Sequence, residues 1–169
     1  GSVQTNGDTV TLGGAEGVAI NEGRIAVDGR AGVNAGAARV DSTQLTLNVR
    51  GGEITADGKG AASNGGEARL FSRGTTVFGR GSKLSARGGD TGDGGLVEVS
   101  GNKFVINGTH DVSAPGGRAG TMLIDPATVS IVDGCACTGT LCDSFTGGSP
   151  FTLDDCVPCC GGNTVTVGK

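Results

Sequence analysis

Six cysteines, all within residues 135–160, are the side chains whose type and spacing most clearly suggest chemistry. They are Cys135, Cys137, Cys142, Cys156, Cys159 and Cys160. An even number of closely spaced cysteines in a segment without histidine is typical of a small module held by disulfides in an oxidising compartment. We therefore predict three disulfides in this segment, and the sequence leaves their connectivity open.

Two other kinds of cysteine chemistry remain as alternatives. A four-cysteine zinc site has suitable C-x-C and C-x-x-C spacings, although it would leave two cysteines unused. Its ligands would be Cys135, Cys137, Cys156 and Cys159. Redox chemistry at Cys156 and Cys159 is the second alternative, but a thioredoxin-like motif needs a βαβ unit, and nothing in this sequence predicts a helix there.

The remaining chemistry-bearing residues are scattered. The GGDTGDGGL run from Gly88 resembles a calcium-binding nonapeptide, but Thr91 stands where a third glycine is required. The single histidine, His110, has no partner at a suggestive spacing, and we expect it at the surface. Asn107-Gly108-Thr109 matches a glycosylation acceptor, a motif that often occurs by chance. We predict no catalytic residue, no cofactor and no metal site, and therefore a protein that is not an enzyme.

The composition limits the elements that can position these residues. Of 169 residues 35 are glycine, none is Trp or Tyr, and the formal net charge is −4. The apolar residues are mostly β-branched, which favours strands and excludes an all-helical fold. The mild acidity argues against a nucleic-acid partner, which needs a basic face. No apolar run approaches the roughly 18 residues of a membrane span.

Internal repeats with a period of about 29 residues organise the first 134 residues. A first series of short apolar runs is centred on Ile25, Ile54, Leu84 and Val112. A second series is centred on Val40, Leu70, Val99 and Ile124. A third series contains Leu45 and Leu47, Val77, Phe104 and Ile106, and finally Val129 and Ile131. Each repeat therefore holds three short strands with period-two alternation and has no room for a helix.

Such a repeat cannot bury its own apolar residues, so successive repeats must stack. The sequence predicts an all-β fold, a right-handed three-faced parallel β-helix (β-solenoid) of about four to five coils over residues 1–134. A cysteine-rich loop or cap follows over residues 135–160, and a C-terminal strand lies within 161–169. The side chains expected inside are Ile54, Leu70, Val77, Leu84, Val99, Phe104, Ile106 and Ile124.

Stacking also places Asp28 above Asp57, which is the arrangement closest to a pair of catalytic carboxylates. Enzymes that cleave polysaccharides need several carboxylates converging on one exposed face. The equivalent position in the next repeat is Arg87, so the row offers no further acid. We expect solvated turn positions here rather than an active site.

Two stretches carry a resemblance to a known family. They are ARGGDTGDGGLVEVSG, which ends at Gly101, and GGRAGTMLIDPATVSI, which begins at Gly116 and includes Leu123-Ile124-Asp125-Pro126. Over roughly residues 20–132 the chain resembles the filamentous-haemagglutinin class of bacterial exoproteins, which are typically exported by two-partner secretion. The resemblance implies an extracellular right-handed parallel β-helix that serves as an adhesin or fibre. It implies no catalytic residue, and it does not extend to the cysteine segment.

The sequence thus favours an extracellular structural or adhesive β-solenoid, located outside the cell or at a bacterial cell surface. Its short stack exposes unpaired strand edges, and no capping helix precedes the first strands, so we expect coils of separate copies to dock end to end into a filament. A cell-surface or carbohydrate ligand is a further possible partner. The alternatives are a monomeric stalk from a long secreted adhesin and a cysteine-based metal or redox module.

Overall fold

The structure, a computed structural model, describes residues 1–13, 17–126, 128–132 and 164–168. Every regular element in these residues is a β-strand. No helix in this part of the chain is long and apolar enough to cross a membrane. The chain divides into two compact units, Gly1–Pro126 and Ala127–Lys169. The boundary expected between residues 134 and 135 lies outside the described residues.

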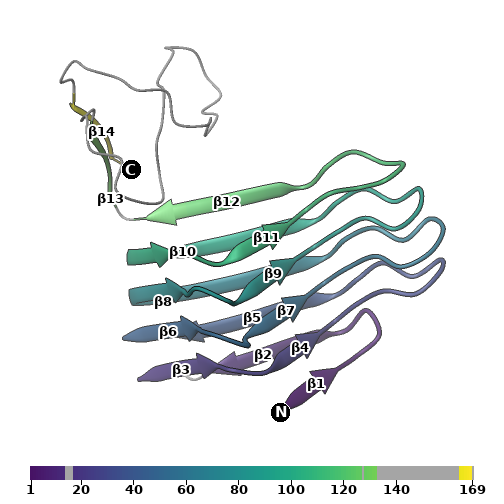
Figure 1. Ribbon diagram of the computed structural model, residues 1–169, viewed down its shortest axis with the longest axis horizontal. Helices are drawn as coiled ribbons and strands as arrows, with labels where there is room; N and C mark the ends of the chain where they lie inside the picture. Colours follow the sequence, from purple (N-terminus) through teal and green to yellow (C-terminus); the bar gives the residue numbers. More distant parts are fainter. Residues whose placement is uncertain (14–16, 127, 133–163, 169) are drawn as a thin grey trace. The chain divides into compact units, whose positions relative to one another are not determined.

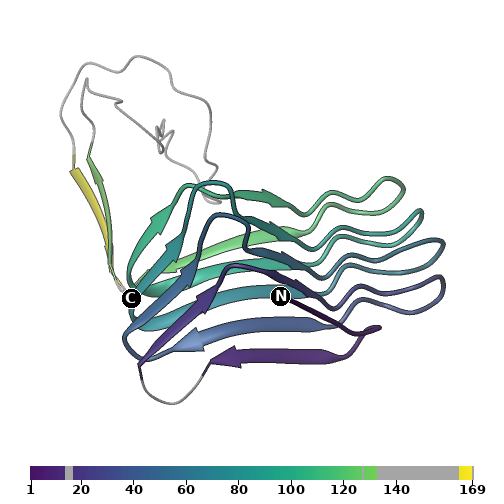
Figure 2. The ribbon, with the colours of Figure 1, turned by 60° about the horizontal axis from the view of Figure 1, so that its bottom comes forward.

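The first unit is a β-solenoid of parallel strands with about four turns (Figures 1 and 2). One sheet has the order β1 (Ser2–Gln4), β4 (Arg24–Ala26), β7 (Glu53–Thr55), β9 (Lys83–Ser85), β11 (Thr109–Asp111). The larger sheet has the order β12 (Thr121–Pro126), β10 (Leu96–Ile106), β8 (Glu67–Phe78), β5 (Ala37–Ser42), β2 (Thr9–Gly13). Within that sheet β6 (Leu45–Asn48) pairs with β8 and with β3 (Val18–Asn21). Neighbouring strands come from successive turns, as the repeat predicts.

The second apolar series forms a ladder inside the larger sheet. Val40 aligns with Leu70, Leu70 with Val99, and Val99 with Ile124. The first three side chains are fully buried and Ile124 is half-buried in the last turn. The predicted register of this series is therefore confirmed.

The predicted alignment of the first series is confirmed for three of its four members. Ile25, Ile54 and Leu84 align across β4, β7 and β9 and are buried. The residue that aligns with Leu84 in β11 is the exposed His110, not Val112. Val112 lies two residues further on and packs half-buried against the core.

The third series faces the other way in its first members, which corrects the expected core. Leu45, Leu47 and Val77 are half-buried and alternate with fully buried neighbours, so they lie on the outer face of the larger sheet. The inward positions of these strands are Thr46, Asn48, Thr76 and Phe78. Because side chains alternate with period two, a change of phase by one residue moves the whole set to the other face.

In the last turn the third series has the expected phase. Phe104 and Ile106 pack half-buried against the core, and Val105 between them is 45% exposed. The register between β8 and β10 shifts between Gly101 and Lys103, which brings Phe104 opposite the inward Thr76. Before the irregularity the outward Glu98 of β10 aligns with Arg69 of β8, and after it the outward Val105 aligns with Val77, so the outward side chains of β10 change from even to odd numbers while those of β8 stay odd.

Hydrogen bonds stabilise the buried polar side chains near the corner where the chain passes from the second series of strands to the third. The Ser42 Oγ and Thr46 Oγ1 atoms are 2.9 Å apart, and Thr46 Oγ1 donates to the Phe71 carbonyl at 2.6 Å. Asn21 Nδ2 donates to Asn48 Oδ1 at 2.8 Å. A buried polar side chain costs little when its partners are present, so this corner holds hydroxyls and amides where the sequence suggested aliphatic side chains.

Gly-rich turns follow β4, β7, β9 and β11 and project as one row (Figure 2). Positive φ accounts for some of these glycines, such as Gly60 at 77°. Gly66 has a different reason, since a Cβ at that position would lie 1.9 Å from the Gly36 carbonyl oxygen of the preceding turn. Close approach of successive turns therefore requires glycine there.

The second unit contains β13 (Thr128–Val132) and β14 (Thr164–Gly168), which pair antiparallel. The segment around Val129 and Ile131, assigned to the repeat from sequence, thus pairs with the C-terminal strand instead. All six cysteines, from Cys135 to Cys160, lie outside the described residues, so their predicted bonding stays a prediction.

Candidate functional site

The end of the stack at its first turn has a hollow surface. β1, β2 and β3 each pair with one strand of the next turn, namely β4, β5 and β6. Their opposite backbone edges pair with no strand among the described residues. This end therefore presents free N–H and C=O groups, which are a template for pairing with another strand.

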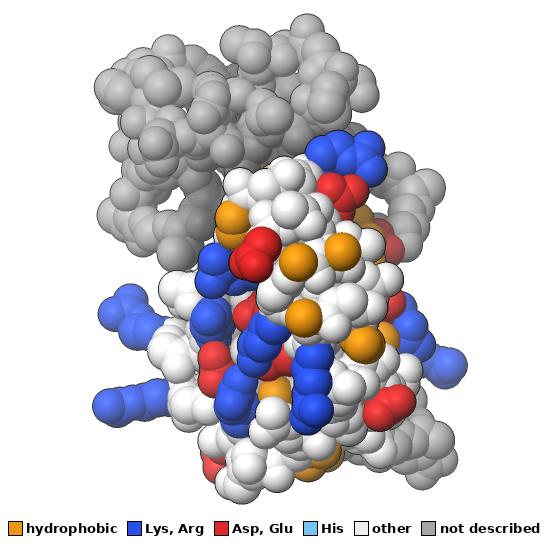
Figure 3. Space-filling model, turned by 90° about the vertical axis from the view of Figure 1, so that its right-hand side faces the viewer, with side chains coloured by type: hydrophobic (Ala, Val, Ile, Leu, Met, Phe, Trp, Pro, Cys, Tyr) orange, Lys and Arg blue, Asp and Glu red, His pale blue; other side chains and the backbone are white. Residues whose placement is uncertain are grey.

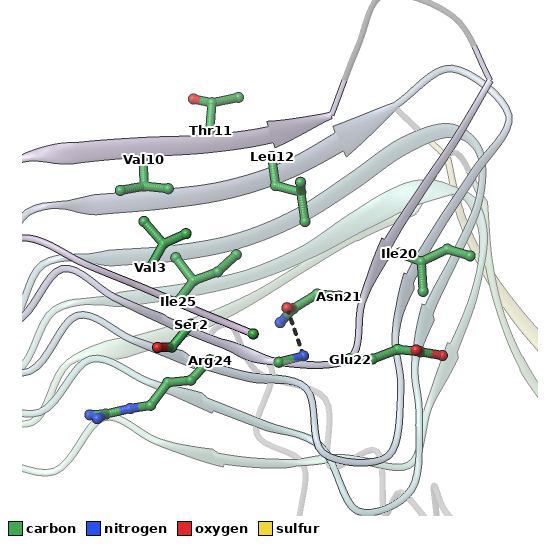
Figure 4. Close-up of a pocket in the computed structure, with 12 residues that line it drawn as sticks. Ser2, Val3, Val10, Thr11, Leu12, Ile20, Asn21, Glu22, Arg24 and Ile25 are labelled. Carbon is green, nitrogen blue, oxygen red and sulfur yellow. Dashed lines mark hydrogen bonds between the residues drawn. The ribbon is translucent and has the colours of Figure 1, made fainter.

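Apolar side chains line the same end. A pocket of about 560 Å³ opens between β1, β2, β3 and β4, and Figure 4 shows Val3, Val10, Leu12 and Ile25 directed into it. Val3 is 51% and Leu12 is 37% exposed, whereas Val40, which lies next to Leu12 in the following turn, is fully buried. These side chains are in core positions of a turn that has a neighbour on one side only.

The lining of this pocket is mostly aliphatic side chains and backbone. Its titratable side chains are Glu22 and Arg24. Arg24 is held by ion pairs to Glu53 at 3.3 Å and to Asp28 at 3.5 Å. The rest of the lining consists of aliphatic side chains, the polar side chains of Ser2, Thr11 and Asn21, and backbone hydrogen-bonding groups of the kind that pair with an added strand.

Asp28 and Asp57 do lie above one another, as the repeat predicts, and they act as structural acceptors. The backbone N–H of Asp57 donates to Asp28 Oδ1 at 3.0 Å, and the N–H of Arg87 donates to Asp57 Oδ1 at 2.8 Å. Lys59 Nζ lies 2.5 Å from Asp28 Oδ2. Burial opposes ionisation of Asp28, but the hydrogen bonds from Lys59 and from the Asp57 backbone outweigh it and lower its pKa.

A second ladder of the same kind runs through the Gly-rich turns. The Asn64 backbone N–H donates to Asn34 Oδ1, the Asp93 N–H to Asn64 Oδ1, and the Arg118 N–H to Asp93 Oδ1, at 2.8–2.9 Å. Arg118 also pairs with Asp93 through its guanidinium at 2.9 Å. Figure 3 shows this side of the molecule, where Lys and Arg side chains lie beside Asp and Glu. Asp93 of the GGDTGDGGL run is thus engaged with Arg118.

The outer face of the larger sheet carries a charged cluster that sequence reasoning missed. The Arg39 guanidinium donates to both Glu67 carboxylate oxygens, at 3.2 and 3.3 Å, and this hydrogen bonding raises its pKa. Arg69 Nε lies 3.4 Å from Glu98 Oε2, and its guanidinium lies 5.3 Å from the centre of the Phe71 ring. These residues occupy the polar phase of the second series, alternating with Val40 and Leu70, and that alternation is the signal that could have found them.

Asp41 lies on the same outer face beside these ion pairs. Burial raises its pKa, and the positive charges of Arg69 and Arg39 only partly offset that effect. Its Oδ1 atom is shielded from solvent and accepts no hydrogen bond. The cluster is therefore a set of mutually neutralising pairs with one poorly solvated carboxylate, and it stabilises the stacking of β5, β8 and β10.

Two other candidates from sequence lie in or next to β11. His110 is exposed in β11, and Asn107 is exposed between β10 and β11. Within the described residues no group of three or more His, Cys, Asp or Glu side chains is arranged to hold a metal ion. Among the candidates that the structure describes, it brings Asp28 and Asp57 together.

Comparison of the chain with protein-family models, with curated proteins and with solved structures finds no match.

Proposed function

We propose that this protein is a structural β-solenoid whose turns dock end to end, so that copies of it build an extracellular filament. The single observation that carries the proposal is the first turn, where unpaired strand edges surround an apolar pocket of about 560 Å³. Exposed apolar surface of this kind is removed from water when a partner strand pairs with the free edge.

The opposite end of the solenoid unit supplies a matching surface. Core positions of the last turn are only half-buried, and they include Phe104, Ile106, Met122 and Ile124. A copy that stacks its first turn on this one would continue the same ladders with the same strand direction. Contact between two different ends does not close on itself and therefore produces an open fibre.

The proposal includes a finer description of the fold, a right-handed solenoid with three faces. Three strand segments recur in each turn, and connections between parallel strands of one sheet are right-handed in nearly all proteins. The family resemblance of the ARGGDTGDGGLVEVSG stretch supports the same handedness and an extracellular adhesive role. A crystal structure of the full chain would directly test the handedness of the solenoid formed by residues 1–126.

The experiment is static light scattering and electron microscopy of the full chain over a range of concentrations. The expected result is growth of linear particles with concentration. Val3→Asp places a charge in the apolar pocket and should abolish growth, whereas Val33→Asp makes the same charge change at an exposed residue of a turn. A monodisperse monomer at high concentration, or equal assembly of the two variants, would refute end-to-end docking and favour a monomeric stalk.

A further inference from the structure

An exposed aliphatic surface on the outer side of the larger sheet has no role in the stack itself. It consists of Val18, Ile20, Leu45, Leu47, Val77 and Val105, which we call the aliphatic face. They come from β3, β6 and the C-terminal halves of β8 and β10, which lie side by side (Figure 1). Leu45, Leu47 and Val77 are the members at which the phase of the third series differs from the sequence prediction.

The register organises this face into two columns. Val18 and Leu45 are aligned in one column, which continues through Thr75 to Lys103. Ile20, Leu47, Val77 and Val105 form the other column across all four strands. Figure 4 shows Ile20 directed away from the solenoid interior while its neighbour Asn21 points inward.

Three members of the aliphatic face are highly exposed for aliphatic residues on a regular sheet, and the other three, Leu45, Leu47 and Val77, are half-buried. Val18 is 54%, Ile20 is 50% and Val105 is 45% exposed. Contiguous exposed aliphatic side chains mark interaction sites more often than single ones do. In β3 and β6 the inward side chains are Ala19, Asn21, Thr46 and Asn48, so these two strands have their larger aliphatic residues outside and smaller or polar ones inside.

Basic side chains without ionic partners among the described residues occur in or next to the strands of the aliphatic face. Lys103 lies in the first column, Arg73 precedes the second half of β8, and Arg50 and Arg80 follow β6 and β8 by two residues. All four are exposed and none is in an ion pair within the described residues. The other basic side chains of the solenoid unit, apart from Arg30, are in ion pairs. Glu22, just after β3, is the acidic residue closest in sequence to these strands.

We infer that the aliphatic face with its four cations docks on an anionic lipid surface. The partner is inferred from charge complementarity, because the unpaired cations attract anionic headgroups. Removal of the aliphatic columns from water at the headgroup boundary adds favourable free energy. A second copy bound through the same face would bring the two sets of cations together. A soluble polyanion would use the cations but leave the aliphatic columns exposed. This surface lies along the side of the stack, and the inference does not depend on end-to-end docking.

The test is co-sedimentation of the full chain with vesicles of phosphatidylcholine containing phosphatidylglycerol, compared with vesicles of pure phosphatidylcholine. We expect binding to the anionic vesicles only, and weaker binding at high salt because exposed charges are screened. The triple variant Arg50→Gln/Arg80→Gln/Lys103→Gln should lose on the order of a hundredfold in partitioning, given the contribution of each cation near an anionic surface. The control triple Arg30→Gln/Arg87→Gln/Arg118→Gln has the same net charge and should keep most of the binding.

A second pair of variants tests the aliphatic columns. Val105→Asp should weaken vesicle binding strongly, whereas Val33→Asp, with the same charge change at a residue of similar exposure, should not. Circular dichroism of both variants verifies that the solenoid is folded.

The absence of binding to anionic vesicles would overturn the inference, as would equal losses of binding in the matched variants. If Val105→Asp dissociates self-assembled particles but leaves vesicle binding unchanged, the aliphatic face binds a second copy instead. Binding of the wild-type chain to dextran sulfate, with none to vesicles, would assign the cations to a soluble polyanion.

Discussion

Replacement of Phe78 by alanine is the sharpest test of which side chains face the interior. Phe78 is fully buried and is the largest such side chain. Its ring fills the space above Gly108, where even a Cβ would come within 2.1 Å of the ring carbon Cε2. Its neighbours in the ladder are Asn48 and Ile106. The removed ring would leave a cavity bounded on both sides by turns that are fixed by their own strand pairing.

The expected cost of Phe78→Ala is about 3–5 kcal/mol, the usual range for loss of a buried phenyl ring. Val77→Ala removes two methyl groups from a half-buried residue on the outer face, and its expected cost is under about 1 kcal/mol. Total stabilities of natural domains are only about 5–15 kcal/mol, so the two variants should differ clearly in behaviour.

Urea denaturation followed by far-ultraviolet circular dichroism measures the difference. Phe78→Ala should move the midpoint far more than Val77→Ala at a similar slope, because the slope reports the surface exposed on unfolding. Val105→Ala, on the same outer column as Val77, is the control and should behave like Val77→Ala. A larger loss for Val77→Ala than for Phe78→Ala would mean that the phase of β8 is inverted, and the aliphatic face would then lie inside.

Three further predictions concern charge, backbone approach and cysteines. The pKa of Asp28 is lowered in the folded state, so the stability that its carboxylate contributes is present above its unfolded pKa of about 4 and is lost as the pH falls below that value. Asp28→Asn should therefore reduce the free energy of unfolding at pH 7 and weaken its decrease at acidic pH, as measured by urea denaturation over a series of pH values. Gly66→Ala should destabilise the solenoid unit by more than about 2 kcal/mol in thermal or urea unfolding, because the added Cβ would lie 1.9 Å from the Gly36 carbonyl oxygen. Gly79→Ala should cost much less, because a Cβ there would lie 3.2 Å from its nearest atom, the Asn48 carbonyl oxygen. Thiol titration of the denatured chain should detect no free thiol before reduction and six after it, and six thiols before reduction would exclude the disulfides.

The repeat in the sequence predicts most of the solenoid because each turn must satisfy the same packing requirement. Val40, Leu70 and Val99 recur at nearly constant spacing inside alternating runs, and the phase that contains them also has Ala38, Ala68 and Val97, whereas the other phase holds Arg39, Arg69 and Glu98. Stacking then follows from the need to bury them. The position of Asp28 above Asp57 follows from the same spacing.

The third series was harder to predict because its apolar phase is the outer one. In Leu45-Thr46-Leu47-Asn48 the alternation rule places the leucines inside, yet the structure buries the threonine and asparagine, which find hydrogen-bond partners in adjacent turns. One signal was available. Counting by twos from Leu70 along β8 leads to Thr76 and Phe78 rather than Val77, so continuity of the strand already favoured the observed phase.

The charged pairs on the outer face were missed for a different reason. Arg39 and Glu67 lie almost one repeat apart, and their contact requires that turns stack with Arg39 opposite Arg69. The sequence predicts the column that holds the two arginines, but the side-chain rotation that carries each arginine toward a carboxylate depends on the neighbouring turn. The alternation identifies the charged residues of the outer face, but which of them pair is known only once the register is known.

The two surfaces that we propose for binding would reinforce one another. Docking of ends adds turns along the stack, and each added copy repeats the aliphatic face on the side of the fibre, offset by the twist of the sheet. A fibre of several copies would then meet a membrane through several faces at once, and once one face has bound, the others are held at high effective concentration near the lipid. Binding of a single copy can therefore be weak while that of the fibre is strong. It follows that Val3→Asp, which removes end-to-end docking, should lower the apparent affinity for anionic vesicles although Val3 is not part of the aliphatic face.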